Sequence, residues 1–173
     1  MRRWALLTVV ACSTGPSGPP EPAQFVAIPS DFQPYASWPS FYVEGSAQNE
    51  NFEAGGPRTV YINQVPAHGS DHFRVGTILV KVIPAGSTYP PDWQVFAMVK
   101  RGGGFDAEGA PGWEFFGLSI DASGVVSIDW RGVGPPPDAG YSGGLLNVTC
   151  VLCHVGSKDN DWVQTPQLQL KNL

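Results

Sequence analysis

The sequence predicts a mainly β domain: an antiparallel β-sheet meander with short helices and little other α content. Glycine (21) and proline (17) are abundant among the 173 residues, which disfavours a helical bundle. Runs of β-branched and aromatic residues recur along the chain, as is typical of strands. Hydrophobic residues make up 42% of the chain, enough to form the core of one domain.

An aromatic segment between Asp31 and Tyr42 opens the domain. It carries four aromatic side chains at spacings of three: Phe32, Tyr35, Trp38 and Phe41. This spacing predicts one face of a helix, interrupted at Pro34 and Pro39 because proline cannot continue helical hydrogen bonding. We expect these side chains to pack in the core and not to form a binding stripe.

Five strands are predicted next from their β-branched and aromatic content. They cover residues 59–64, 77–83, 94–100, 113–120 and 125–130. Asp121 to Gly124 joins the last two strands as a tight hairpin, and a glycine-rich loop runs from Arg101 to Pro111. A short helical segment with the sequence CVLCH then follows near the C-terminus.

The first residues have the composition of an export signal. A positively charged start precedes the apolar stretch Trp4 to Ala11, which is too short to span a bilayer. The ending VVAC resembles a bacterial lipobox, in which the cysteine, here Cys12, becomes the lipidated first residue. The alternative is an ordinary secretory signal with a chance cysteine.

A domain division follows from this signal. We expect a lipoprotein signal peptide over 1–11, a tether rich in proline, glycine and serine over 12–24, and one folded domain over 25–173. A lipid on Cys12 would anchor the domain to a membrane on the periplasmic side of the bacterial cell envelope. Ser13 favours the outer membrane, by resemblance to bacterial lipoproteins.

The charge balance excludes one class of partner. Ten Lys and Arg residues stand against fifteen Asp and Glu residues, and the formal net charge is -5. No basic stripe runs along the chain, so nucleic-acid binding is not expected.

The sequence Cys150-Val151-Leu152-Cys153-His154 is a CxxCH motif. Two thiols at this spacing can add to the two vinyl groups of one porphyrin, and the adjacent histidine can then bind the iron as the proximal ligand. The motif therefore predicts one covalently attached haem c. Two alternatives stay open: a disulfide between the cysteines, which does not explain the histidine, and a zinc site completed by His68 and His72.

Lys81 is a second informative residue because it stands inside the apolar run TILVKVI. Burial of an ammonium group between apolar faces is costly, and it favours a neutral, nucleophilic amine. The alternative is a lysine on an edge strand that points to water and blocks aggregation.

Together these segments resemble the cytochrome P-460 family over about residues 28–165. The resemblance is carried by FQPYASW, RTVYIN, GTILVK, the hairpin from Phe115 to Trp130, the CxxCH motif and the ending SKDNDWV. It implies a mostly antiparallel β fold and a five-coordinate haem iron. It also implies a covalent bond between the porphyrin edge and the strand lysine, here Lys81, and oxidation of hydroxylamine. The chain departs from the family at two places. Many members have glutamate where this chain has Val82, and the catalytic type has a proton-transferring acid shortly before the haem motif, where residues 144–149 hold none. Asp129, Arg131 or Asp138 are the candidates to transfer protons in its place.

Three functions compete at this point. The first is an oxidoreductase that acts on hydroxylamine or a related nitrogen species and passes electrons to a periplasmic redox partner. The second, by resemblance to the related cytochrome c′-beta branch, is binding of nitric oxide or carbon monoxide in an apolar distal pocket, for which Phe73, Leu79 and Phe96 are candidates. The third is an electron carrier with a sixth iron ligand, Met98 or His72. Homodimers are frequent in the family that the chain resembles, so a homodimer is also expected.

Overall fold

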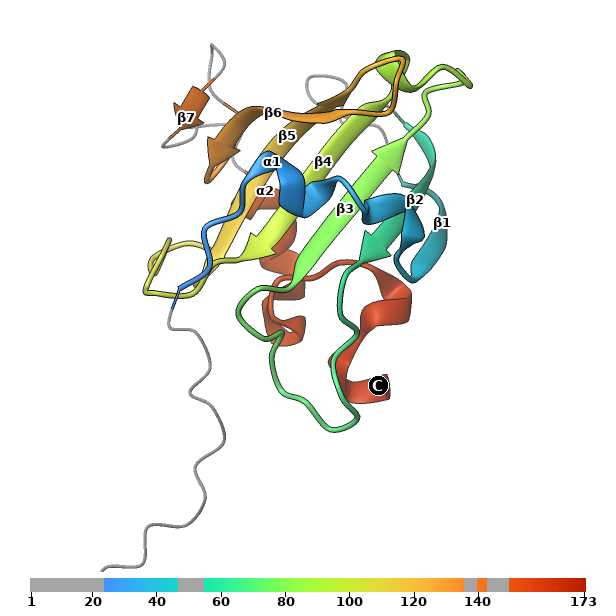
Figure 1. The fold of residues 1–173 in the computed structure, drawn as a ribbon. Helices are drawn as coiled ribbons and strands as arrows, with labels where there is room; N and C mark the ends of the chain where they lie inside the picture. Colours follow the sequence, from blue (N-terminus) through green and yellow to red (C-terminus); the bar gives the residue numbers. More distant parts are fainter. Residues whose placement is uncertain (1–23, 47–54, 136–139, 143–149) are drawn as a thin grey trace, which may run out of the picture.

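The structure, a computed structural model, describes residues 24–46, 55–135, 140–142 and 150–173, with one sheet at its centre (Figure 1). Six strands follow one another as an antiparallel meander, and a seventh pairs in parallel with the sixth. The strands are β1 (Ser40–Ser46), β2 (Gly56–Ile62), β3 (Ile78–Ile83), β4 (Gln94–Lys100), β5 (Trp113–Ile120), β6 (Val126–Gly132) and β7 (Gly140–Ser142). The mainly antiparallel fold expected from the sequence is confirmed.

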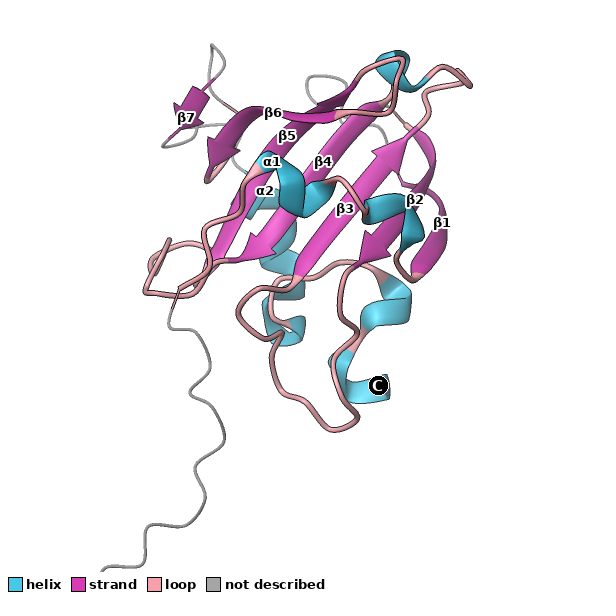
Figure 2. Cartoon of the chain, viewed as in Figure 1, coloured by secondary structure: helices cyan, strands magenta, loops and turns pink. Residues whose placement is uncertain are grey.

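The helices are short and lie outside the sheet, as Figure 2 shows. They are α1 (Pro29–Phe32), η1 (Tyr35–Ser37), η2 (Pro90–Asp92), α2 (Cys150–His154), η3 (Val155–Asn160), η4 (Pro166–Leu168) and η5 (Leu170–Asn172). No helix in the described part of the chain is long and apolar enough to cross a membrane. The expected signal peptide and nearly all of the expected tether, with Cys12, lie outside the described residues.

The aromatic segment of residues 31–42 is not one helix, and here the sequence expectation is wrong. The chain makes two short turns, α1 and η1, and then enters β1 at Ser40. Trp38 is extended, with φ -80° and ψ 161°, as expected for a residue that precedes a proline. The helix therefore ends before Pro39, and Phe41 lies on a strand.

The hairpin between β5 and β6 forms where it was predicted. The Gly124 amide donates to the Asp121 carbonyl oxygen at 2.9 Å, and Gly124 has φ 82°, a conformation that favours glycine. The Asp121 side chain also accepts from the Ser123 amide at 2.8 Å, as in an Asx turn.

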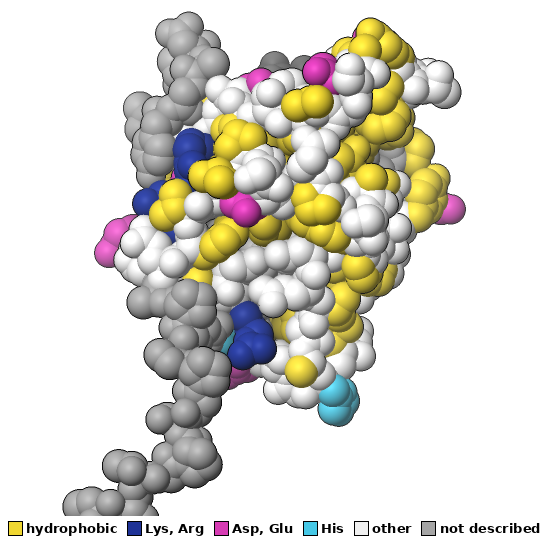
Figure 3. Space-filling model, viewed as in Figure 1, with side chains coloured by type: hydrophobic (Ala, Val, Ile, Leu, Met, Phe, Trp, Pro, Cys, Tyr) yellow, Lys and Arg dark blue, Asp and Glu magenta, His cyan; other side chains and the backbone are white. Residues whose placement is uncertain are grey.

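The two faces of the sheet are covered by opposite ends of the chain. We call them the N-terminal face and the C-terminal face. Phe32 and Tyr35 pack on the N-terminal face, where Val80 and Phe116 lie; the Phe32 and Phe116 ring centroids are 5.2 Å apart. The segment with α1 lies in front of the sheet in Figure 1, and the chain from α2 onward passes behind and below it. Charged side chains are few and scattered on the side that carries α1 (Figure 3).

A buried ionic cluster fastens the N-terminal segment. Glu114 on β5 is fully buried, and its carboxylate accepts from Arg131 at 2.7 and 2.8 Å and from Arg101 at 3.2 Å. Arg131 also donates to the Ala27 carbonyl oxygen at 2.9 Å. A buried carboxylate needs such partners, and through Arg131 they tie the start of the domain to the sheet.

Candidate functional site

The CxxCH motif forms the helix α2 against the C-terminal face of the sheet. Val151 and half-buried Cys150 pack with the core of this face, while Leu152 and Cys153 are exposed. Positions three and four apart share one side of a helix, so Cys150, Cys153 and His154 project to one side. The short helix expected from the spacing is therefore confirmed.

His154 is held in a defined orientation. Its Nδ1 lies 2.6 Å from the carbonyl oxygen of Trp162, and its ring packs edge-on against Phe115 with centroids 5.2 Å apart. Because a carbonyl only accepts, Nδ1 carries a proton, and in the neutral imidazole Nε2 then carries the lone pair. This is the tautomer and the outer hydrogen bond that metal-binding histidines use. The donor set of two thiols and one oriented imidazole thus fits a haem c.

The chain after α2 is folded onto itself by Asn160. Its side-chain amide donates to the carbonyl oxygens of Val163 at 2.7 Å and Leu168 at 3.1 Å, and it accepts from the Leu170 amide at 2.7 Å. These bonds bury Val163, Leu168 and Leu170 in the core of the C-terminal face. The segment that carries the Trp162 carbonyl is therefore a packed part of the domain.

Lys81 lies on β3, the third of seven strands, so the edge-strand interpretation is wrong. The neighbouring side chains Val80 and Val82 pack on the N-terminal face, which directs Lys81 to the C-terminal face. Its Nζ lies 5.3 Å from the centroid of the Phe96 ring, and Lys81 is half-buried. The lysine and α2 are thus on the same face of the sheet.

An aromatic row continues from Lys81 across the sheet. The backbone register pairs Lys81 with Phe96, Phe96 with Gly117 and Gly117 with Trp130. The Phe96 and Trp130 centroids are 6.5 Å apart, and the Trp130 indole covers Gly117, where a Cβ atom would lie 2.0 Å from Nε1. Gly117 therefore leaves room for the Trp130 indole in the row beside Lys81.

The three residues expected to line a distal pocket occupy different places. Phe96 is half-buried and adjacent to Lys81, and Leu79 lies on the same strand and face as Lys81 but is 3% exposed. Phe73 is fully buried in the loop before β3, with its ring 5.8 Å from that of Trp113. Phe96 is thus the one among them that adjoins the lysine and remains partly accessible.

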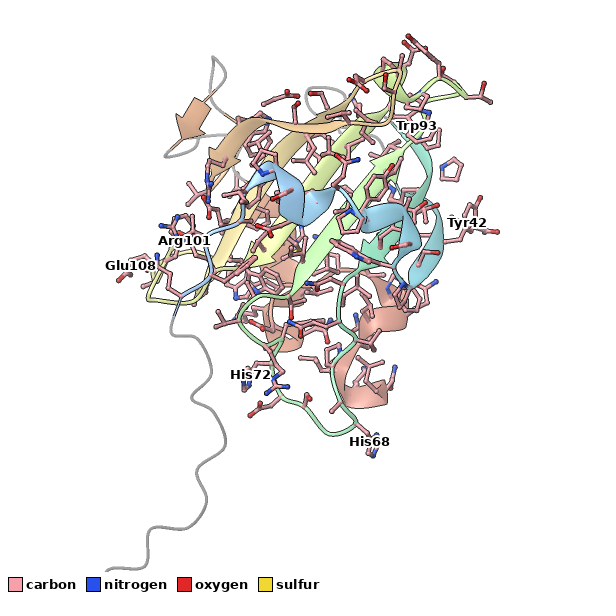
Figure 4. The ribbon with its side chains drawn as sticks, viewed as in Figure 1. Tyr42, His68, His72, Trp93, Arg101 and Glu108 are labelled. Carbon is pink, nitrogen blue, oxygen red and sulfur yellow. The ribbon has the colours of Figure 1, made fainter. Side chains whose placement is uncertain are left out.

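The residues proposed for alternative metal sites are separated. His68 and His72 lie on the loop between β2 and β3 and point away from the sheet (Figure 4). His68 donates to the Leu173 carbonyl oxygen, and the hydrogen bond from His72 lowers the pKa of exposed Asp71. Within residues 24–46, 55–135, 140–142 and 150–173, no three His, Cys, Asp or Glu side chains come together as a metal site.

The other two alternatives also find little support. Neither Cys150 nor Cys153, the two cysteines that the structure describes, forms a disulfide. Met98 is 7% exposed and pairs with Leu79 and Phe115 in the core of the C-terminal face. It is a core residue in this structure, as its position in a strand suggested.

The candidate proton-transfer residues are not gathered at Lys81. Arg131 binds Glu114 in the cluster that fastens the N-terminal segment, and Asp129 is exposed and accepts from the Ser119 hydroxyl at 2.8 Å. Asp138 and the acid-poor segment of residues 144–149 lie outside the described residues. The described neighbours of Lys81 along the aromatic row are therefore uncharged.

Sequence reasoning missed two features of this site. The backbone carbonyl of Trp162 leaves no signature in a residue pattern, although the ending DWV had been noted. The second feature is the Trp130 indole that lies over Gly117. A glycine among the large residues of β5 could have indicated it, because a glycine within a strand often marks the close approach of another group.

Comparison of the chain with family models, with curated proteins and with solved structures found no match.

Proposed function

We propose that this protein is an exported, lipid-anchored c-type cytochrome of the cytochrome P-460 type. Cys150 and Cys153 would hold one haem by thioether bonds, and His154 would be the proximal iron ligand. The observation that carries the proposal is the hydrogen bond from His154 Nδ1 to the Trp162 carbonyl oxygen at 2.6 Å. It leaves Nε2 as the metal-binding nitrogen on the helix that carries both thiols.

When bound, a haem would supply an iron at which a small molecule could bind and react. The chain's own residues define the surroundings of the motif that would hold it. The C-terminal face that carries α2 is apolar: Leu79 and Phe115 are buried in its core, and Phe115 packs against the His154 ring. Lys81 is half-buried on the same face, with its Nζ 5.3 Å from the Phe96 ring centroid, and is our candidate for the cross-link to the porphyrin edge.

The activity that we propose is oxidation of hydroxylamine or a related nitrogen species, with electrons passed to a periplasmic redox partner. The proposal rests on the resemblance in sequence and is supported by the placement of Lys81 and the CxxCH helix on one face. Residues 144–149 before the haem motif hold no carboxylate that could accept the released protons, so we expect slow turnover.

The test is expression in the periplasm together with a haem-maturation system. Denatured wild-type protein should retain one haem by mass and by its pyridine haemochrome spectrum. Cys150→Ser or Cys153→Ser should leave a single thioether bond, and His154→Ala should abolish normal iron ligation. His68→Ala, a matched loss of an exposed imidazole, should have no effect. A colourless wild-type protein, or one that takes up zinc, would refute the assignment.

Binding of nitric oxide or carbon monoxide is the second candidate function. It is favoured by the uncharged character of the row beside Lys81, formed by Phe96, Gly117 and Trp130. Tight nitric oxide binding without hydroxylamine turnover would select this function. A low-spin spectrum would instead indicate an electron carrier, for which core-packed Met98 is a poor sixth ligand.

The membrane anchor has its own test. Cys12→Ser should stop lipid labelling and release the domain from the membrane fraction. An unchanged membrane association would refute lipidation at Cys12 while leaving haem attachment intact.

A further inference from the structure

The carbonyl that receives the His154 hydrogen bond belongs to an uncommon turn. Asp161 has φ 48° and Trp162 has φ 68°, so two consecutive residues with side chains adopt the left-handed conformation. Such residues rarely occupy this region, and they remain there only when their surroundings fix them.

The Asp161 carboxylate holds the turn through both of its oxygens. Oδ1 accepts from Lys100 Nζ at 2.6 Å and from Trp113 Nε1 at 3.3 Å, and Oδ2 accepts from the Phe73 backbone amide at 2.9 Å. The donors come from the end of β4, the start of β5 and the loop before β3. The turn is thereby fastened to one end of the sheet.

The cation that pairs with Asp161 is itself fixed by the sheet. Lys100 Nζ donates to the Pro111 carbonyl oxygen at 3.1 Å and lies 5.0 Å from the Trp113 ring centroid. The side chains of Lys100 and Asp161 are each only 12% exposed. An ion pair that is this little exposed and has several further hydrogen-bond partners fixes the position of its carboxylate more tightly than an ion pair on the surface does.

We propose that Asp161 is a positioning residue for His154, and this inference rests on the proposed haem attachment. Trp162 directly follows Asp161, so the carboxylate fixes the carbonyl oxygen that accepts from His154 Nδ1. That hydrogen bond sets the tautomer and ring orientation of a metal-bound histidine and increases its electron donation to the metal. Asp161 thus tunes the iron from a distance, through the backbone.

The decisive variant is Asp161→Asn. Both carboxylate oxygens of Asp161 accept hydrogen bonds, and each faces only donors. The side-chain NH₂ group in Asp161→Asn would therefore face a donor in either orientation of the amide and could not replace the lost hydrogen bond. Asp159→Asn is the matched control, because it makes the same charge change at an exposed position two residues earlier. All measurements use the holoprotein made with the haem-maturation system.

We expect equal covalent haem content in the wild type and both variants. Asp161→Asn should lower the iron–histidine stretching frequency of the ferrous protein and raise its midpoint potential, because the imidazole donates less to the iron. Asp159→Asn should change neither quantity. If Asp161→Asn matches the control in both, the positioning role is overturned although haem attachment stands. Absence of covalent haem from the wild type would instead refute the proposed function.

Lys100→Met keeps the test decisive if Asp161→Asn does not fold. It removes one of the three anchors of the carboxylate and leaves the Trp113 and Phe73 donors in place. We expect smaller shifts in the same two directions, and a wild-type frequency and potential would overturn the proposal.

Discussion

Gly117 is a position where one methyl group should disrupt the aromatic row. A Cβ atom there would lie 2.0 Å from Nε1 and 2.5 Å from Cε2 of Trp130, far inside van der Waals contact. The glycine lies within β5 and has no positive φ, so alanine suits its backbone. The cost of Gly117→Ala should therefore come from displacement of the indole, and overpacking of this kind costs about 1–3 kcal/mol.

The same substitution should stabilise the protein once the indole is gone. In a Trp130→Ala background the methyl group has room, and alanine in a strand interior is favoured over glycine by about 0.5–1 kcal/mol. The sign of the Gly117→Ala effect on the free energy of unfolding should thus reverse between the two backgrounds. We expect a coupling of about 1.5–4 kcal/mol between the two sites.

Urea unfolding followed by far-ultraviolet circular dichroism measures this coupling in four proteins, provided that the m-values agree. Gly156→Ala is the control, because a Cβ atom at Gly156 would meet nothing within 4 Å. It should have the same small effect in both backgrounds. If Gly117→Ala changes stability equally, within about 0.5 kcal/mol, with and without Trp130, the indole does not lie over Gly117.

Three further substitutions test other parts of the structure. A cross-link through Lys81 should give the wild-type holoprotein an absorption band that is red-shifted from that of ordinary haem c. Lys81→Arg keeps the positive charge but removes the primary amine, so this variant should show an ordinary haem c spectrum. Persistence of the red-shifted band in Lys81→Arg would exclude Lys81 as the cross-link. Glu114→Gln should lower the free energy of unfolding by about 3–5 kcal/mol, since the guanidinium groups of Arg101 and Arg131, only 17% and 20% exposed, lose their buried anion. A loss below about 1 kcal/mol in urea unfolding would contradict that role. Burial and the nearby Tyr61 raise the pKa of Tyr35 above 10.0, so its contribution to stability is complete below pH 10 and is lost as the pH rises further. Tyr35→Phe should reduce this alkaline loss, and equal loss in both proteins between about pH 9 and about pH 11 would contradict it.

The strands of this fold were predictable because their residues carry the information locally. β3, β4 and β5 are runs of β-branched and aromatic residues, and Asp121 and Gly124 have the turn chemistry that a tight hairpin requires. The CxxCH spacing likewise predicts a short helix, because the three groups are useful only on one side.

β1 and β7 were missed because pairing with the neighbouring strand forms them. Residues Ser40–Ser46 include two serines, a glutamate and a glycine, and they become a strand by pairing with β2. β7 is three residues long and follows β6 in parallel, which no local pattern announces. Strand propensity is weak evidence where the partner strand decides the conformation.

The sequence also could not show which end of the chain covers which face of the sheet. A strand with one solvent-exposed face alternates between apolar and polar residues. β3 has the sequence ILVKVI without such alternation, because both of its faces are covered. Which end of the chain covers which face depends on contacts such as Phe32 with Phe116 and His154 with Phe115. These contacts join residues far apart in the sequence and are set by the packing of the whole domain.

At position 81 a lysine stabilises the fold less than an apolar side chain would. An apolar side chain buried at the same position would gain about 1.5–3 kcal/mol, whereas an ammonium beside an aromatic ring gains about 0.5–2 kcal/mol and must lose part of its hydration. The surrounding strand positions Leu79, Val80, Val82 and Ile83 all follow the stability rule and are buried. A single exception inside an otherwise consistent strand is expected where a residue is retained for chemistry. Because this exception faces the same side of the sheet as the CxxCH helix, we infer that the lysine and the motif serve one site.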